Sequence, residues 1–358
     1  MQFYNSHIHI FTEQDIPNRF LPLALVKVLR TRVGFHFVSR SLMRLNPFTD
    51  KDMFDRYVKF VQIGKLGSQR KIFEECRKYY PEGTRFIVLT MDMAFMGAGP
   101  VPRPYEDQLK DIYELCKDYP EIIPFLHIDP RRENHYDILR QSVEEYGFQG
   151  IKLYPPLGYF PTDERLFPVY EYCTAGKLPV IAHCSPYNPV RFKGSYNELM
   201  KLLSFSPIPI ETKGKRRKEL CSLFTHPLNY LSLIAKFPDL RICFAHFGSE
   251  YYWERYMSHP EEEGNWFNII RSLMEEYDNF YADISFTLNN PSFFPLLKIM
   301  LANEKLRKKI LFGSDYYMVE TVADERRFGI ELRAYIGEEY FHTIANDNVE
   351  RFLNILTT

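Results

Sequence analysis

Residues 1–10 read MQFYNSHIHI, an apolar and aromatic run interrupted by short polar residues. A run of this length and composition predicts a buried β-strand. No GxGxxG turn follows it, and that glycine-rich turn is typical of a doubly wound sheet that binds dinucleotides. The first strand therefore argues against a doubly wound sheet.

Similar runs recur along the chain, and amphipathic stretches such as YEDQLKDIYELCKDYP separate most of them. Strands that alternate with helices indicate parallel βαβ units. Eight strands of this kind predict an α/β fold, a (β/α)8 TIM barrel. The seven later runs are TRFIVLTMDM (84–93), IIPFLHIDP (122–130), FQGIKLYPP (148–156), KLPVIAHCS (177–185), LRICFAHFG (240–248), NFYADIS (279–285) and KILFGSD (309–315).

Two intervals between predicted strands are too long for a simple crossover, and they follow strands one and five. They span residues 13–80 and 186–239. Both begin where a barrel forms its active site, at the carboxyl ends of strands. We interpret them as lid-like insertions, with oligomer contacts as the alternative. No stretch of linker composition divides the chain, so residues 1–358 are expected to form one domain.

Composition narrows the classes of partner. The formal net charge is −1 over 358 residues, which argues against nucleic acid or a membrane surface as a general partner. The six cysteines show no CxxC spacing, and no signal peptide or apolar membrane span is visible. A cytoplasmic protein that acts on a small molecule is therefore expected.

Five polar residues fall at the ends of predicted strands, where a barrel collects its functional groups. They are His7, His9, His183, His246 and Asp315. Residues i and i+2 of a strand point the same way, so His7 and His9 can converge on one ion. His183 can reach that ion from across the barrel, and Asp315 from the strand that closes beside the first.

Imidazole nitrogen and carboxylate oxygen are ligands for a divalent metal. His7, His9, His183 and Asp315 are therefore the predicted ligands, with one position left open for water or substrate. Zinc is the expected metal, with manganese or iron as alternatives.

The set His7-x-His9, His183, His246 and Asp315 resembles the amidohydrolase superfamily, and more narrowly its amidohydrolase-2 group of metal-dependent TIM-barrel hydrolases and decarboxylases. The phrases GIKLYPP, HPLNYLSLIAKFPDLRICFAHFG, ILFGSDYY and IANDNVERFL are similar to signatures of that group. The resemblance implies metal ligation by the four residues named above, and one ion rather than two. It implies catalytic roles for Asp315, as proton acceptor, and for His246, which would titrate near neutrality and stabilise an oxyanion or transfer a proton.

Three further residues are candidates for substrate binding. Lys152, in the fourth strand, is expected to contact a substrate carboxylate or carbonyl; carbamylation that bridges two metals and a structural salt bridge are its alternatives. His127 and Arg131 flank the end of the third strand and could line the pocket. The second-tier residues Asp92, Asp129 and Asp283 could orient other groups or cap helices.

The resulting hypothesis is a metal-dependent hydrolase that uses a metal-activated water on a small amide, lactone or ester. The first alternative is metal-dependent, non-oxidative decarboxylation of an aromatic or dienoic carboxylic acid. The second is a non-catalytic barrel that serves as a binding protein. The resemblance is compatible with a homodimer, for which the aromatic-rich insertions would supply an interface.

Overall fold

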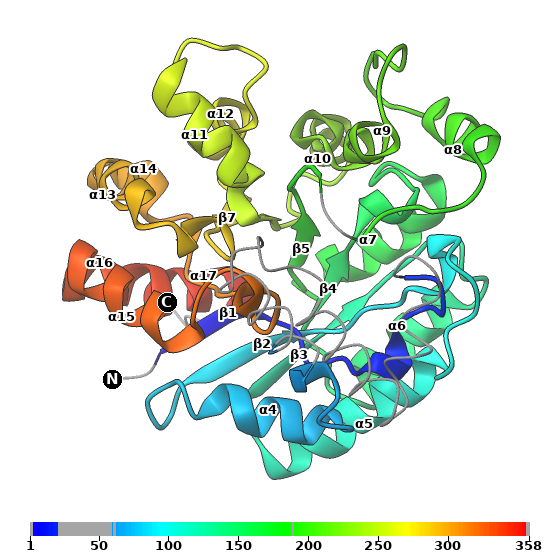
Figure 1. The fold of residues 1–358 in the computed structure, drawn as a ribbon, viewed down its shortest axis with the longest axis horizontal. Coiled ribbons are helices and arrows are strands. Elements are labelled where there is room, and N and C mark those ends of the chain that lie inside the picture. Colours follow the sequence, from blue (N-terminus) through cyan, green and yellow to red (C-terminus); the bar gives the residue numbers. More distant parts are fainter. Residues whose placement is uncertain (1–2, 21–58, 60–61, 188–189, 356–358) are drawn as a thin grey trace, which may run out of the picture.

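The computed structural model describes residues 3–20, 59, 62–187 and 190–355. Eight parallel strands pair in the order in which they occur in the chain, and helices surround them (Figure 1). The predicted TIM barrel is therefore confirmed. The strands are β1 (Tyr4–Ile8), β2 (Arg85–Leu89), β3 (Ile122–His127), β4 (Gly150–Leu153), β5 (Val180–His183), β6 (Ile242–Ala245), β7 (Phe280–Asp283) and β8 (Ile310–Leu311).

The helices lie between consecutive strands and after the last one. A single α-helix follows each of β2, β3 and β4, whereas β5, β6 and β7 are each followed by two or more α-helices. The helices are α4 (Gln69–Arg77), α5 (Tyr105–Asp118), α6 (His135–Glu144), α7 (Phe167–Ala175), α8 (Tyr196–Leu203), α9 (Arg217–Ser222), α10 (Leu231–Lys236), α11 (Glu250–Ser258), α12 (Trp266–Glu276), α13 (Phe294–Ala302), α14 (Glu304–Arg307), α15 (Glu325–Ile336), α16 (Glu338–His342) and α17 (Asn348–Leu353).

Strand residues alternate between two apolar cores. The inner core fills the barrel and includes Ile123, Phe125, Ile181 and Tyr281. The outer core lies between the strands and the helices and includes Ile8, as expected from its place between His7 and His9. Side chains two apart on a strand share a face, so this division fixes which residues point into the barrel.

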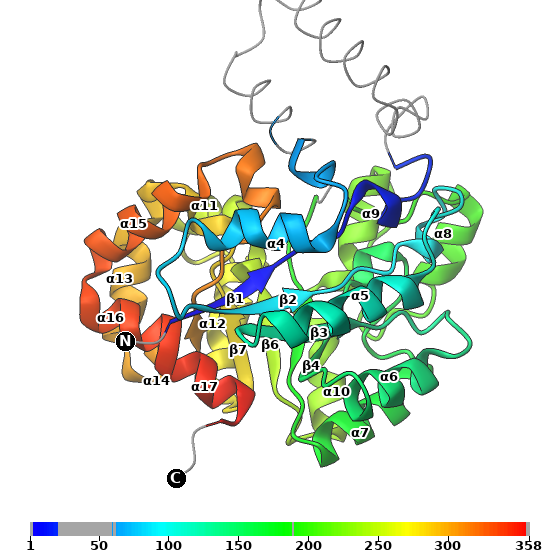
Figure 2. The same cartoon turned by 90° about the horizontal axis from the view of Figure 1, so that it is seen from below.

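The lower end of the barrel is closed by apolar packing. Phe352 of α17 belongs to the inner core, with its ring 5.1 Å from the ring of Tyr281. Figure 2 shows α17 towards the lower end of the barrel and α9 towards the upper end. The polar residues gather at the upper end, where the strands finish, which is where TIM barrels place their active sites.

The seam between β1 and β8 closes the barrel through residues beyond the regular ladder. The backbone N–H of Ser6 donates to Phe312 O at 2.9 Å, and that of Asp315 donates to His7 O at 2.8 Å. The Asn5 carboxamide bridges the same seam: Nδ2 donates to Ser314 Oγ at 2.8 Å, and Oδ1 accepts from Ser314 N at 3.1 Å. The predicted eighth strand over 309–315 is thus shorter in the structure.

The insertion after β1, predicted over 13–80, lies largely outside the described residues. Its described parts include the 3-10 helix η1 (Glu13–Asp15) and α4. The interval 186–239 holds α8, α9 and α10, of which α8 begins at the N-cap Ser195, whose side chain accepts from Glu198 N. The lid role of both intervals stays a prediction.

Candidate metal centre and active site

The predicted site residues lie at or just beyond the carboxyl ends of five strands and inside a sixth. Each is nearly excluded from solvent except Arg131, which is partly exposed. His7 lies in β1 and His9 just after it; His127 ends β3, Lys152 lies in β4, His183 ends β5, His246 follows β6, and Asp315 lies four residues after β8.

One atom from each of three residues converges at the seam of the barrel. His7 Nε2 and His9 Nε2 each lie 3.5 Å from Asp315 Oδ1. These three residues form one of the groups whose ligand atoms all lie within 4.8 Å of one another. The structure therefore brings together three of the four residues that we predicted as metal ligands.

The hydrogen bonds of the two imidazoles fix which nitrogen carries the proton. His7 Nδ1 donates to Asp283 Oδ2 at 2.9 Å, and His9 Nδ1 donates to Leu89 O at 3.0 Å. Because a neutral imidazole has one N–H, both Nε2 atoms present lone pairs. Two nitrogen lone pairs therefore face the carboxylate of Asp315.

Three electron-pair donors that point at one another suit a cation between them. Burial, and next the charge of Lys152, lower the pKa of His9 to about 3, so its imidazole is neutral at pH 7. Burial raises the pKa of Asp315 well above its usual range, which means that its negative charge is costly there, and a cation beside it would offset that cost. Asp315 Oδ1 has no hydrogen-bond partner within the described part of the chain. The donor set fits a divalent metal such as zinc.

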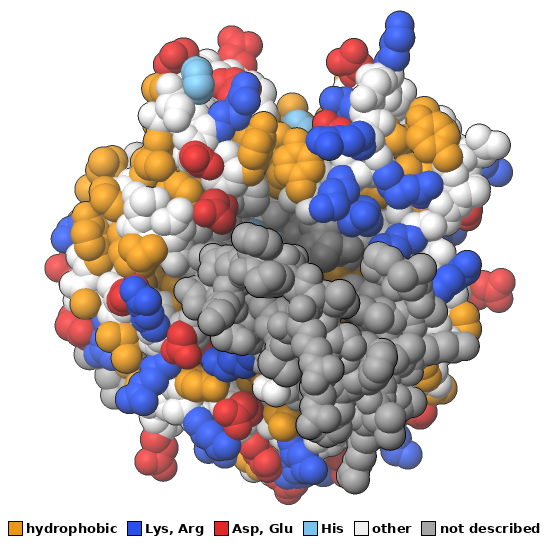
Figure 3. All heavy atoms as spheres, in the orientation of Figure 1, with side chains coloured by type: hydrophobic (Ala, Val, Ile, Leu, Met, Phe, Trp, Pro, Cys, Tyr) orange, Lys and Arg blue, Asp and Glu red, His pale blue; other side chains and the backbone are white. Residues whose placement is uncertain are grey.

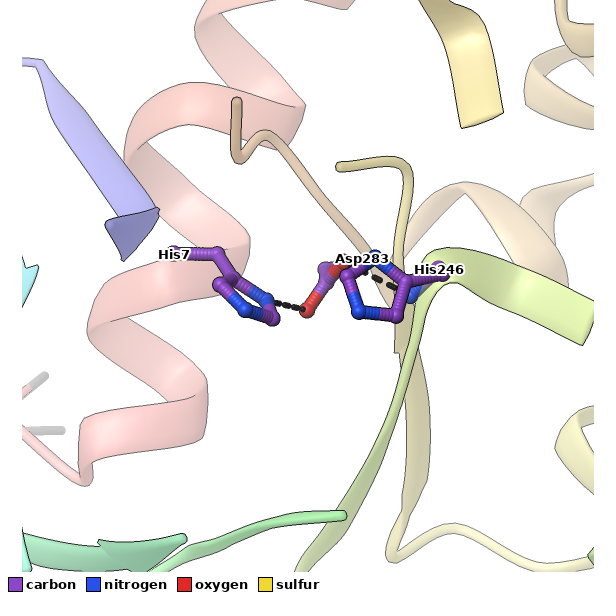
Figure 4. A group of neighbouring side chains, drawn as sticks. All are labelled: His7, His246 and Asp283. Carbon is purple, nitrogen blue, oxygen red and sulfur yellow. Dashed lines mark hydrogen bonds and ion pairs between the residues drawn. The ribbon is translucent and has the colours of Figure 1, made fainter. Parts of the chain in front are cut away.

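A second group lies behind His7 and consists of His7, His246 and Asp283 (Figure 4). Asp283 Oδ1 accepts from the backbone N–H of His246 at 3.0 Å, while its other oxygen holds His7. Ser285 Oγ lies 3.1 Å from His7 Nδ1 and 3.0 Å from His246 Nδ1. Because His7 Nδ1 is already bonded to Asp283, it is not free to bind a metal. We therefore interpret the second group as one that orients the His7 ring for the first group, His7, His9 and Asp315.

The pKa of His246 differs from the near-neutral value that we expected from the sequence. Burial is the main reason why its pKa falls to about 3, and the neighbouring His7 adds to the shift. His246 Nδ1 lies 3.1 Å from Ser285 O, and a carbonyl only accepts, so Nδ1 carries the proton. His246 Nε2 is therefore a proton acceptor.

His183 faces the same space from β5. Its ring centroid lies 4.8 Å from that of His246, and its ring stacks on Tyr154 at 4.2 Å. Among the residues described, His183 is in neither convergent group. Metal ligation by His183 stays a prediction.

Lys152 is fully buried beside the first group. Its Nζ lies 3.5 Å from His7 Nε2. Burial lowers the pKa of Lys152 to about 8, against the opposing charges of Asp283 and Asp315. The substrate-contact, carbamylated and structural roles predicted for Lys152 all remain open.

Arg131 is engaged by protein groups. Its guanidinium contacts both oxygens of Asp129, at 2.8 Å and 2.5 Å, and donates to Leu157 O at 3.0 Å. The paired Asp129 therefore orients Arg131, and its predicted contact with substrate stays a prediction. The neighbouring Arg132 donates to Asp92 Oδ2 at 2.6 Å.

Sequence reasoning missed some of the residues that organise the site. Asp283 was a second-tier candidate because it ends a strand, yet it holds His7 and His246 together. Ser285 and Tyr154 were not predicted. Ser285 lies two residues beyond Asp283, and Tyr154 lies two residues beyond Lys152; the period-two rule applied past the strand ends would have found both.

Loops that follow β2, β4 and β5 meet at the carboxyl end of the barrel, and the loop after β5 carries Arg191 and Lys193. Lys193 N donates to Met96 O at 2.7 Å, and Phe192 N donates to Pro156 O at 2.8 Å. Burial, and then the charge of Arg191, lower the pKa of Lys193 to about 8. Figure 3 shows Lys and Arg side chains gathered over α9 and beside α8. This surface favours an anionic molecule.

A model of the family described as Amidohydrolase matches residues 57–355. The match covers most of the chain but begins after His7 and His9. No curated protein matches the sequence closely enough to count as a relative. Within the described part of the chain, no helix has the length and apolarity needed to cross a bilayer.

Solved structures resemble the fold at low identity. A 4-oxalomesaconate hydratase from Rhodopseudomonas palustris is 16% identical and superposes with a TM-score of 0.53, over 98% of this chain and 95% of that one. A probable 2-pyrone-4,6-dicarboxylic acid hydrolase from Acinetobacter baumannii, with citric acid bound, is 11% identical with a TM-score of 0.53, over 99% and 100% of the two chains. At these identities the likeness shows the fold.

Proposed function

Since the chain belongs to the amidohydrolase family, and is an amidohydrolase-like enzyme, we propose that it is a metal-dependent hydrolase of a small lactone, amide or ester. The observation that carries the proposal is the convergence of His7 Nε2, His9 Nε2 and Asp315 Oδ1. Three electron-pair donors in one buried place form a stable arrangement when a cation neutralises their repulsion. His183 is proposed as a further ligand from the opposite side of the barrel.

When bound, a divalent ion at this place supplies a Lewis acid for a substrate carbonyl and lowers the pKa of a coordinated water towards 7. The residues of the chain supply positioning and proton transfer. Asp283 holds the His7 ring through the 2.9 Å bond to Nδ1, so that Nε2 is turned towards Asp315, where the two residues would hold the ion. Asp315 accepts the proton of the attacking water, because its carboxylate is the base nearest to the ligand nitrogens.

His246 takes part as a proton acceptor. Because its Nδ1–H is held by Ser285 O, Nε2 is the nitrogen available to a leaving group or to a water. Of the two roles predicted for His246, proton transfer is the one that this tautomer supports. Stabilisation of an oxyanion would need a donor, and an imidazole that donates through Nδ1 has none at Nε2.

The first test is metal content after purification in zinc-containing buffer. We expect about one equivalent of metal in the wild type and a large loss in the His7→Ala/His9→Ala double variant. His226→Ala is the matched control, since His226 is a half-buried histidine outside the site whose Nδ1 accepts from Leu228 N at 3.2 Å. Less than half an equivalent in the wild type, or equal metal in the double variant, would refute the proposal.

The second test separates hydrolysis from decarboxylation. Zinc-loaded enzyme is assayed against a panel of lactones, amides and esters that includes 2-pyrone-4,6-dicarboxylate, and carbon dioxide is measured in parallel. Hydrolysis that Asp315→Asn reduces by at least about a hundredfold is expected from the loss of the proton acceptor. Release of carbon dioxide without a hydrolytic product would assign the chain to the decarboxylases instead.

A further inference from the structure

His127 ends β3 with one ring nitrogen that the protein leaves unsatisfied. The residue is 1% exposed, and its Nε2 has no hydrogen-bond partner in the described part of the chain. Buried polar atoms are nearly always paired, because an unpaired one costs free energy. The Nε2 of His127 therefore needs an explanation that the fold alone does not give.

The other ring nitrogen fixes the tautomer. The backbone N–H of Asp92 donates to His127 Nδ1 at 2.9 Å. An N–H can only donate, so Nδ1 carries a lone pair, and a neutral ring must carry its hydrogen on Nε2. Burial, opposed by the charge of Asp129, lowers the pKa of His127 to about 3, so the ring is neutral at pH 7. His127 thus presents a fixed Nε2–H donor.

The strand register places this donor inside the upper end of the barrel. Ile123 and Phe125 belong to the inner core, and His127 is the next residue on the same face of β3. On the neighbouring strand, a Cβ added to Gly150 would lie 2.4 Å from Phe125 Cζ, so position 150 faces inward too. His127 pairs with Lys152 in the ladder, two residues beyond Gly150. His127 and Lys152 therefore face the mouth of the barrel from adjacent strands.

We propose that His127 Nε2–H donates to a carboxylate oxygen of the substrate, beside the ammonium group of Lys152. The inference rests on the proposed function and narrows its substrate class to molecules that carry a carboxylate. A carboxylate accepts two donors side by side, and the adjacent positions of His127 and Lys152 offer an N–H and a cation. The positive loops around Lys193 and Arg191 attract the same class of molecule.

Two substitutions at this position separate the donor role from a structural role. In His127→Asn, the amide oxygen replaces Nδ1 as acceptor for Asp92 N–H, and the Nε2–H is lost. In His127→Gln, the longer side chain places an amide N–H near the position of Nε2, and the hydrogen bond from Asp92 N–H is lost. A structural role predicts that the Asn variant is the milder change, whereas the donor role predicts the opposite for ligand binding.

The probe is isophthalate, a flat dicarboxylate with no bond to hydrolyse, titrated calorimetrically into the zinc-loaded full-length enzyme. The neutral isophthalamide is the control ligand, and His226→Asn is the control variant. We expect His127→Asn to weaken isophthalate binding about 10- to 100-fold, the loss typical of a hydrogen bond to a charged acceptor. We expect His127→Gln to recover most of the affinity and both variants to keep the zinc content of the wild type.

The outcomes separate this inference from the proposed function, because zinc content reports on the latter. Absence of isophthalate binding to the wild type would overturn the inference. So would equal affinities of wild type and His127→Asn, a weaker affinity in His127→Gln than in His127→Asn, or a loss of zinc in the Asn variant. A wild type that binds isophthalate but no zinc would instead refute the proposed function.

Discussion

Glu325 gives the enzyme a pH-dependent stability that one substitution should remove. Its side chain is buried at the start of α15, where it accepts a hydrogen bond from the Tyr80 hydroxyl. Burial raises its pKa from 4.5 to about 7. The nearby Glu320, also buried, accepts from Glu325 N at 3.3 Å and pairs with Lys59. A second carboxylate nearby adds to the cost of ionising Glu325.

The sign and size of the effect follow from the two pKa values of Glu325. The folded state holds the proton more tightly than the unfolded state, so this stability is present below pH 4.5 and is lost as the pH rises through 7. At about 1.4 kcal/mol for each unit of pKa difference, the loss amounts to about 3 kcal/mol. Glu325→Gln keeps an acceptor for Tyr80 and cannot ionise, so it should not show this loss.

The assay is urea-induced unfolding at pH 5, 6, 7 and 8 for the wild type and the Gln variant. We expect similar free energies of unfolding at pH 5 and a variant that is more stable by about 2–3 kcal/mol at pH 8. Other groups that titrate in this range are common to both proteins and cancel in the difference. Glu331→Gln on the same helix is the control, which loses the ion pair with Arg327 but leaves Glu325 and its neighbour Glu320 unchanged. Parallel profiles for wild type and Glu325→Gln from pH 5 to 8 would refute the reasoning.

Two more predictions concern the site and the barrel interior. Asp283→Asn should weaken zinc affinity about 10- to 100-fold, because His7 loses the carboxylate that orients it; competition with a chromogenic chelator measures this, and unchanged affinity would contradict the role of Asp283. Gly150→Ala should lower the free energy of unfolding in urea by about 1–3 kcal/mol, because its Cβ would meet the Phe125 ring. Gly264→Ala, where a Cβ meets nothing within 4 Å, is the control and should be near neutral. Equal stability of the two alanine variants would contradict the packing argument.

Much of the fold could be predicted because apolar residues recur with a different spacing in strands and in helices. Each of the eight predicted runs contains a strand, and YEDQLKDIYELCKDYP contains α5. The ends of strands were less predictable. The run 309–315 holds only the two-residue β8, since Phe312 N donates to Ile344 O, outside the sheet, at 2.8 Å. Farther on, Asp315 adopts a positive φ of 66° and its N–H bonds to His7 O. Such a turn depends on a partner far away in the chain.

The same holds for the site: the positions of its residues could be predicted from the local sequence, but the contacts between distant residues could not. Position at a strand end was enough to nominate His7, His9 and Asp315, whose ligand atoms converge. The tautomers were not predictable, because the group that holds each ring comes from another strand. Asp283 lies 276 residues from the His7 that it orients. Likewise, burial lowers the pKa of His246 to about 3, which the sequence position did not indicate.

The seam between β1 and β8 has a consequence for the order in which the site can form. His7 and Asp315 belong to the first and last strands, and the bond from Asp315 N to His7 O joins them directly. During synthesis from the amino terminus, the imidazoles emerge early and the carboxylate only after more than three hundred further residues. Under the proposed function, a nascent chain therefore lacks the complete set of proposed ligands until its eighth strand has been made, so metal loading would belong to the end of folding.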